Sequence, residues 1–448
     1  MKKNLLSLVA LLANVVLAAN AQSTPAITFE AGTVERTVTI GLNAAGTVKV
    51  DWGTGEQVEQ TAAAAYDGWD NALEFTGTPS GTVKIYGEGI IYFQAFTKYE
   101  SGTDVISGGI TSIDLSNAAT ITELDVHQNN LATLDLSKLT ALTSLTAGVN
   151  DFETIDLSAN TELTKLDLQN GKNNGKLTSI DLSKNVKLTN IVLSGNKLTT
   201  LDVSKNVLAK TITVLNNQLA TVNLGANTNK KHTINLGNNK LTAIDLSQFA
   251  DASGSFIYLR DNDLTGDAIK LAEGKTVQRL WVDGNAFTLA QLYALKSLAT
   301  QTFTYATTFT KAQAQQPYAI AEAIKVGETV DLSSQATLGT TASTIVWKNA
   351  EGTALVEGTD YSVANGVFTF LTAQEAIHAE LTNAELPNFT EAKPYITTVL
   401  KVEGNTDGIS SVAADVQGDD AWFNLNGQRV AAPVKGLYIK NGKKVIVK

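Results

Sequence analysis

Residues 177–204 read LTSIDLSKNVKLTNIVLSGNKLTTLDVS, which is one complete repeat and the start of the next. One half of the unit, Leu-Thr-x-Ile/Leu-Asp-Leu/Val-Ser, occurs at 177–183 and returns 21 residues later at 198–204. The other half, at 190–196, reads x-Ile/Leu-x-Leu-x-x-Asn. Such a period predicts a solenoid, in which each coil buries its apolar face only against its neighbours. Because solenoids usually work through a long surface, the repeat favours binding over catalysis.

The asparagine half occurs eight times along the chain and defines the register of the coils. Each copy has two apolar positions spaced by two, such as Leu166 and Leu168 or Ile191 and Leu193. In seven copies an asparagine follows three residues after the second apolar position: Asn129, Asn150, Asn196, Asn217, Asn239, Asn262 and Asn285. The third copy has Gly171 there, inside an insertion.

This pattern resembles the leucine-rich repeat family, whose motif is LxxLxLxxNxL. The resemblance implies that the seven asparagine side chains form a structural ladder, which satisfies backbone groups where each strand turns. The physical reason is that an orphaned polar group at a buried corner costs roughly 1–3 kcal/mol. Asparagine as a ligand contact is the alternative.

A column of aspartates runs through the other half of the repeat: Asp114, Asp135, Asp156, Asp181, Asp202 and Asp245, with Asn223 in one copy. A serine, or once a glycine, follows two residues after each. Coils ~4.8 Å apart would make neighbouring carboxylates repel by ~0.9 kcal/mol even in water. Two interpretations offset this repulsion: hydrogen bonds from turn N–H groups to the carboxylates, or weakly bound cations.

The residues that flank the buried pairs should point outward from the sheet. Among these 24 positions, aromatic residues occur only in the last two coils, together with arginines. Binding hot spots favour Trp, Tyr and Arg, and aromatic faces also suit sugar rings. The candidate ligand-binding residues are therefore Phe256, Tyr258, Arg260, Arg279, Trp281 and Asp283. They either bind a partner or pack against the following domain; the second candidate surface is Glu123, Asp125 and His127 in the first coil.

The sequence as a whole predicts a mainly β protein: a central leucine-rich repeat solenoid, flanking β-sandwich-like domains and a short C-terminal β tail. In residues 33–50, valines alternate with other residues on both sides of a turn, and this pattern predicts a hairpin. The turn DWGTG at 51–55 resembles that of PKD-type modules. The expected divisions are a signal peptide at 1–21, an N-terminal β domain with the PKD-like turn at 22–105, the solenoid with a helical cap at 106–302, an Ig-like β-sandwich at 303–405, and a sorting-like tail at 406–448.

The N-terminus has the pattern of a secretory signal peptide, with a basic start, an apolar run from Leu5 to Ala19 and an A-x-A site. No other stretch approaches the ~20 apolar residues of a transmembrane helix. The chain has no cysteine, which excludes disulfides, thiol catalysis and thiolate metal sites.

The C-terminal residues resemble the sorting domains of the bacterial type IX secretion system. The matching segments are an aromatic-x-x-x-Gly-x-x-Val strand at 423–430, Gly-Leu-Tyr-Ile at 436–439 and Lys-Val-Ile-Val-Lys at 444–448. The resemblance implies contact with export machinery and release from, or attachment to, the outer surface, as in surface proteins of Bacteroidetes-type bacteria. A further hairpin of the preceding domain is the alternative.

Charge and motif content argue against several function classes. All 44 acidic residues lie within 22–425, whereas eight of the 34 basic residues lie outside that range, so this body carries a charge of about −18 and should repel nucleic acid. The sequence contains no G-x-S-x-G or P-loop motif, and we predict no catalytic residue, metal or cofactor. We expect an exported surface or extracellular protein that binds a protein or peptide, as an adhesin or host-interaction factor. The alternatives are a glycan-binding protein and a hydrolase hidden in a flanking β domain.

Overall fold

The computed structural model shows a mainly β protein. The structure describes residues 24–31, 37–61, 72–97, 109–171, 174–227, 229, 231–305, 315–404, 421–425, 427–440 and 443–448. These residues fall into two units, one of Met1–Tyr318 with Asn383–Tyr395 and one of Ala319–Thr382 with Ile396–Lys448. The expected signal peptide lies outside the described residues.

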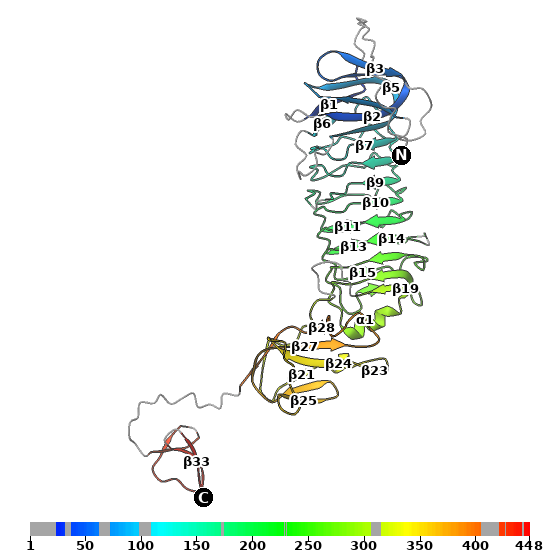
Figure 1. Cartoon of the computed structure of the whole chain (residues 1–448). Helices are drawn as coiled ribbons and strands as arrows, with labels where there is room; N and C mark the ends of the chain where they lie inside the picture. The colour runs from blue at the N-terminus through cyan, green and yellow to red at the C-terminus, as the bar shows by residue number, and fades with distance from the viewer. Residues whose placement is uncertain are drawn as a thin grey trace, which may run out of the picture. The chain divides into compact units, whose positions relative to one another are not determined.

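The N-terminal strands form antiparallel pairs that continue directly into the solenoid sheet. They are β1 (Ile27–Ala31), β2 (Val38–Asp51), β3 (Gln57–Thr61), β4 (Leu73–Gly77), β5 (Val83–Thr97) and β6 (Ile110–Asp114). Strand β2 pairs with β3, β4 and β5, and β1 pairs with β5 and β6. The later part of β5 pairs in parallel with the first solenoid strand, with Phe93 opposite Leu124. One sheet therefore runs through both regions (Figure 1).

The hairpin expected at residues 33–50 is wrong over the described part of that range. Strand β2 is continuous, and register shifts on either side of Ala45 bend it. Irregularities of this kind absorb extra residues that read in sequence as a turn. The expected turn at 51–55 is present, because Asp51 accepts hydrogen bonds of 2.9 Å from the N–H groups of Gly53 and Gly55.

The solenoid presents one face of short parallel strands in register (Figure 1). In order, they are β7 (Glu123–Asp125), β8 (Ser144–Thr146), β9 (Lys165–Asp167), β10 (Asn190–Val192), β12 (Thr211–Thr213), β14 (Thr233–Asn235), β16 (Phe256–Tyr258), β18 (Val277–Trp281) and β19 (Ala299–Thr304). The first eight are the strands that the repeat predicts, and β19 extends the sheet beyond the last repeat.

The apolar pairs of the repeat point into the core, which confirms the expected register. Leu166 pairs with Leu145 and with Ile191, and all three side chains are fully buried. Leu193 and Leu236 are also fully buried. Each such side chain contributes ~1.5–3 kcal/mol of burial free energy.

The other face and the end of the solenoid use fewer regular elements. Two short parallel pairs lie on the opposite face, namely β11 (Thr200–Asp202) with β13 (Thr221–Asn223), and β15 (Ile244–Asp245) with β17 (Ile269–Lys270). Helix α1 (Leu289–Lys296) follows β18, begins with a Thr288/Gln291 capping box and buries three leucines. The helix lies where the leucine spacing at 289–298 predicts one.

The second unit contains two small sheets around the buried Trp347. One has the order β20 (Ala323–Lys325), β29 (Leu400–Glu403), β27 (Gln374–Thr382), β24 (Thr344–Asn349). The other has the order β21 (Thr329–Asp331), β26 (Val367–Phe370), β25 (Tyr361–Ala364). The shorter elements are η2 (Ser333–Gln335), β22 (Thr337–Leu338), β23 (Thr341–Ala342) and β28 (Tyr395–Ile396).

The C-terminal residues of the same unit form an antiparallel sheet. Its strands are β30 (Trp422–Phe423), β31 (Arg429–Val430), β32 (Gly436–Lys440) and β33 (Lys443–Val447), in the order β31-β30-β32-β33. Tyr438 is its buried residue, with its ring edge-on to Trp422.

Candidate functional site

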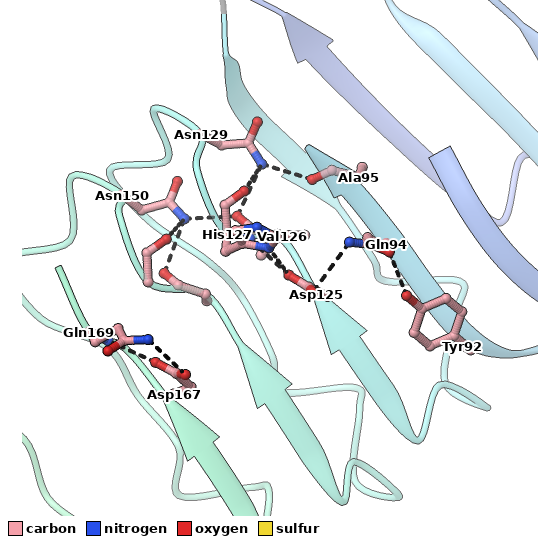
Figure 2. A network of polar contacts seen from close by, with 12 residues as sticks. Tyr92, Gln94, Ala95, Asp125, Val126, His127, Asn129, Asn150, Asp167 and Gln169 are labelled. Atoms are coloured by element: carbon pink, nitrogen blue, oxygen red, sulfur yellow. Dashed lines mark hydrogen bonds and ion pairs between the residues drawn. The ribbon is translucent and has the colours of Figure 1, made fainter. Parts of the chain in front are cut away.

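The seven repeat asparagines lie in buried corners and link neighbouring coils. Figure 2 shows two of them, Asn129 and Asn150. For Asn150, Nδ2 donates to the carbonyl of Val126 in the preceding coil at 2.8 Å and to that of Ala147 in its own coil at 3.1 Å. Its Oδ1 accepts from the N–H of Leu131 at 3.0 Å. The side chain thus meets donors and acceptors that no strand pairing satisfies, and it is largely buried.

A second asparagine column, which the sequence analysis missed, runs through the other half of the repeat: Asn160, Asn185, Asn206 and Asn227. All four side chains are almost fully buried. Nδ2 of Asn185, for example, donates to the carbonyls of Leu157 and Asn160 in the preceding coil, both at 2.9 Å. The detectable signal was an asparagine two residues after the serine or glycine in four successive copies.

The aspartate column forms exposed turns. In each copy a carboxylate oxygen accepts a hydrogen bond of 2.8 or 2.9 Å from the N–H of the serine two residues later, as in Asp135 with Ser137 and Asp181 with Ser183. These bonds lower the pKa of the carboxyls below its usual range, because they favour the charged form. Within the described residues, no group of three or more His, Asp or Glu side chains is arranged to hold a metal ion. The geometry is that of turn hydrogen bonding.

The six candidate residues lie at the last two repeat coils, and we call them the terminal patch: Phe256, Tyr258, Arg260, Arg279, Trp281 and Asp283. Phe256, Tyr258, Arg279 and Trp281 lie on the adjacent strands β16 and β18, whereas Arg260 and Asp283 follow the ends of these strands. Asp283 is buried, so the expectation that it points outward is wrong. Strand pairing sets Phe256 opposite Arg279 and Tyr258 opposite Trp281. The rings of Tyr258 and Trp281 stack, with centroids 4.2 Å apart and planes 14° apart. Both side chains are half-buried. The sheet therefore holds an aromatic pair at its surface.

The two arginines of the terminal patch have different surroundings. Nη2 of Arg260 lies 2.7 Å from Oδ2 of Asp283, whose side chain is only 7% exposed. The guanidinium carbon of Arg279 lies 4.9 Å from the ring centroid of Phe256. Within the described residues, Arg279 makes no ion pair, and its Nε is buried without a hydrogen-bond partner. Asp283 thus holds Arg260, whereas the guanidinium of Arg279 lies against the Phe256 ring.

The outward residues of the first coil form a polar network (Figure 2). Tyr92 donates to Gln94 at 2.7 Å, and Nε2 of Gln94 lies 3.4 Å from Asp125. Asp125 accepts from the backbone N–H of His127 and contacts its ring Nδ1. The hydrogen bond with Asp125 raises the pKa of His127 although burial opposes it. With Glu123 half-buried beside it, this surface is polar and internally paired.

The other histidine contact of chemical interest is closed to solvent. Nδ1 of His232 lies 2.9 Å from Oγ of Ser255. His232 is 3% exposed and Ser255 is fully buried. A serine–histidine pair in this position cannot meet a substrate, and burial lowers the pKa of the imidazole.

Comparisons with known proteins point to repeat proteins of low sequence identity. The functional domain of InlJ from Listeria monocytogenes is 17% identical, covering 66% of this chain and 64% of that chain at a TM-score of 0.42. A leucine-rich repeat protein of Leptospira interrogans is 16% identical, covering 44% and 65% at a TM-score of 0.26. The internalin InlF of Listeria monocytogenes is 17% identical, covering 47% and 79% at a TM-score of 0.23. The chain thus spans less than two thirds of the first two structures.

No protein-family model and no curated protein matches the chain. No helix among the described residues combines the length and the apolar character needed to cross a membrane. Nothing about the ligand follows from the structural likenesses, so the functional argument depends on the residues of the solenoid face.

Proposed function

We propose that this chain is an exported surface or extracellular binding protein whose solenoid face binds a protein or peptide through the terminal patch. The observation that carries the proposal is the Tyr258–Trp281 stack beside Arg279, on the outward face of a continuous parallel sheet. Half-buried aromatic and arginine side chains held on a rigid β-sheet lose little conformational freedom on binding. An adhesin or host-interaction role is the context we favour.

The stacking geometry favours a protein partner over a glycan. A sugar ring binds against the face of an aromatic ring. Tyr258 and Trp281 each give one face to the other, so that face of each ring is closed to a sugar. Ring edges flanked by arginine suit the apolar and carbonyl groups of a polypeptide. Glycan capture is therefore the second candidate, and no open serine–histidine pair in the described residues favours a hydrolase.

The route to the surface is part of the proposal. Residues 1–21 would be removed as a signal peptide, and residues 406–448 would engage the export machinery. The described strands β30–β33 fold as a small sheet with exposed apolar side chains at Val434 and Ile446, which supports a tail that another protein recognises. The two sheets around Trp347 support an Ig-like sandwich within 303–405, after an N-terminal β domain at 22–105.

A matched pair of variants tests the binding surface. Trp281→Ala removes half of the aromatic stack, whereas Thr146→Ala changes the same outward face near the other end of the sheet. Extracellular or host-surface proteins that the wild type retains in a pull-down should be lost with Trp281→Ala and kept with Thr146→Ala. Retention by both variants would place the binding surface elsewhere, and retention of glycans alone on an array would support the second candidate.

A further inference from the structure

We propose that the terminal patch recognises an acidic peptide segment, with Arg279 as the anchor for an aspartate or glutamate carboxylate of the partner. The inference rests on the proposed function and adds the chemistry of the ligand. It follows from the unequal states of the two arginines and from the position of Arg279 beside the aromatic stack.

Arg260 is already committed to a carboxylate of this chain. Asp283 is almost fully buried and lies 2.7 Å from its guanidinium. Withdrawing Arg260 toward a ligand would leave a buried carboxylate without its cation, which is strongly unfavourable. Arg260 therefore shapes the surface and is a poor choice for the ligand anchor.

Arg279, unlike Arg260, has no carboxylate partner within the described residues. Its neighbours across the sheet are Phe256 on β16 and Thr302 on β19, and neither carries a negative charge. A ring below a guanidinium attracts the cation but accepts no N–H bond within the guanidinium plane. Nε of Arg279 is buried, so the Nη groups are the donors that remain for an acceptor from outside, and a carboxylate can accept from both of them.

The surroundings of Arg279 favour a carboxylate on a peptide over a phosphate or an acidic sugar. A phosphate carries up to two negative charges, and one unpaired arginine in a protein of net charge −10 would leave part of that charge uncompensated. A single carboxylate balances Arg279. The adjacent Tyr258 and Trp281, which give a face to each other, can then be covered by an apolar residue next to the acidic one.

The test uses a displayed library of random peptides selected on the mature full-length chain. The most enriched peptide is synthesised with its acidic residue and with the uncharged Asn or Gln analogue. Both are titrated against the wild type, Arg279→Gln and Lys165→Gln, an exposed outward position on β9. We expect the wild type and Lys165→Gln to lose about tenfold or more in affinity for the analogue. Arg279→Gln should bind both peptides equally and weakly.

The outcomes separate this inference from the proposed function. If the selected peptides carry no excess of Asp or Glu, or if Arg279→Gln still distinguishes the two peptides, the acidic anchor is overturned. Selective binding of phosphorylated peptides or acidic glycans overturns it as well. Loss of the selected peptide with Trp281→Ala would still support the terminal patch in those cases. Binding that survives Trp281→Ala, or a library that yields no peptide, contradicts both proposals.

Discussion

The ring of Tyr258 lies face to face with the indole of Trp281, 4.2 Å away on the neighbouring strand. This contact joins two successive coils at the outward surface, so the repeat that builds the core also sets the spacing of the aromatic pair. Parallel strands ~4.8 Å apart bring equivalent outward side chains to about the separation of stacked rings. The pair is therefore held in place before any ligand arrives.

Replacing Trp281 by alanine should weaken ligand binding by ~2 kcal/mol or more, about thirtyfold. The fold should lose only the stacking contact with Tyr258, ~0.5–1.5 kcal/mol, because the indole lies outside the buried core. Titration calorimetry and chemical denaturation measure the two effects. If the patch instead packs against the following domain, the variant will be strongly destabilised and its intrinsic affinity unchanged.

Asn217 joins two coils through three carbonyl acceptors and the N–H of Leu198. Asn217→Ala should lower the free energy of unfolding by ~1–3 kcal/mol, because the buried carbonyls and N–H lose their partner. The control is Thr213→Ala, which changes an outward residue of the same coil and should cost under ~0.5 kcal/mol. Urea denaturation compares the two, and equal losses would contradict the assignment of faces.

Features that depend on residues close together in the sequence could be predicted, whereas features that depend on residues far apart in the sequence could not. The burial of Leu166 and Leu193 was predictable because a local period decides it, and the positions of Phe256 and Arg279 on one surface followed from the same register. The unequal pairing of the arginines was not predictable. Arg260 reaches Asp283 one coil away, whereas the residues opposite Arg279 are Phe256 and Thr302, and side-chain conformations decide which contact each arginine makes. Strand β19 has no repeat motif, so the sequence did not predict it. Its position is explained by its pairing with β18, which would otherwise be the edge strand of the sheet.

In the N-terminal region, the sequence pattern does not distinguish a bulged strand from a hairpin. The alternation in residues 33–50 predicts strand structure, but a bulged strand and a hairpin present nearly the same pattern of apolar and small residues. Pairing of β2 with β3, β4 and β5 decides between them, and these partners lie farther along the chain. The missed column at Asn160 and Asn185 had a clear period, but polar residues in surface turns are common enough to hide it.

The contact between His127 and Asp125 should make part of the stability depend on pH. The raised pKa of His127 means that the pair stabilises the fold fully below the unfolded value near 6.5. This contribution is lost as the pH rises through the higher folded pKa. His127→Gln should therefore reduce the denaturation midpoint more at pH 5.5 than at pH 8.5. Both side chains are partly exposed, so we expect a difference of ~1 kcal/mol or less. The same loss at both pH values would show that the charge of His127 does not matter.

Deleting residues 408–448 should stop export after the first membrane, because the signal peptide would still be cleaved after Ala21 while the tail would be missing. The sheet β30–β33 is the element we propose for the final step. Tyr438→Ala provides a finer test within the full chain, since Tyr438 is the buried residue of this sheet and its hydroxyl accepts from the N–H of Val434. Cell fractionation with antibodies should find both variants in the periplasm, and Ser247→Ala in the solenoid should reach the surface or medium like the wild type. Normal surface amounts of the deletion variant would show that the tail is only a folded C-terminal extension.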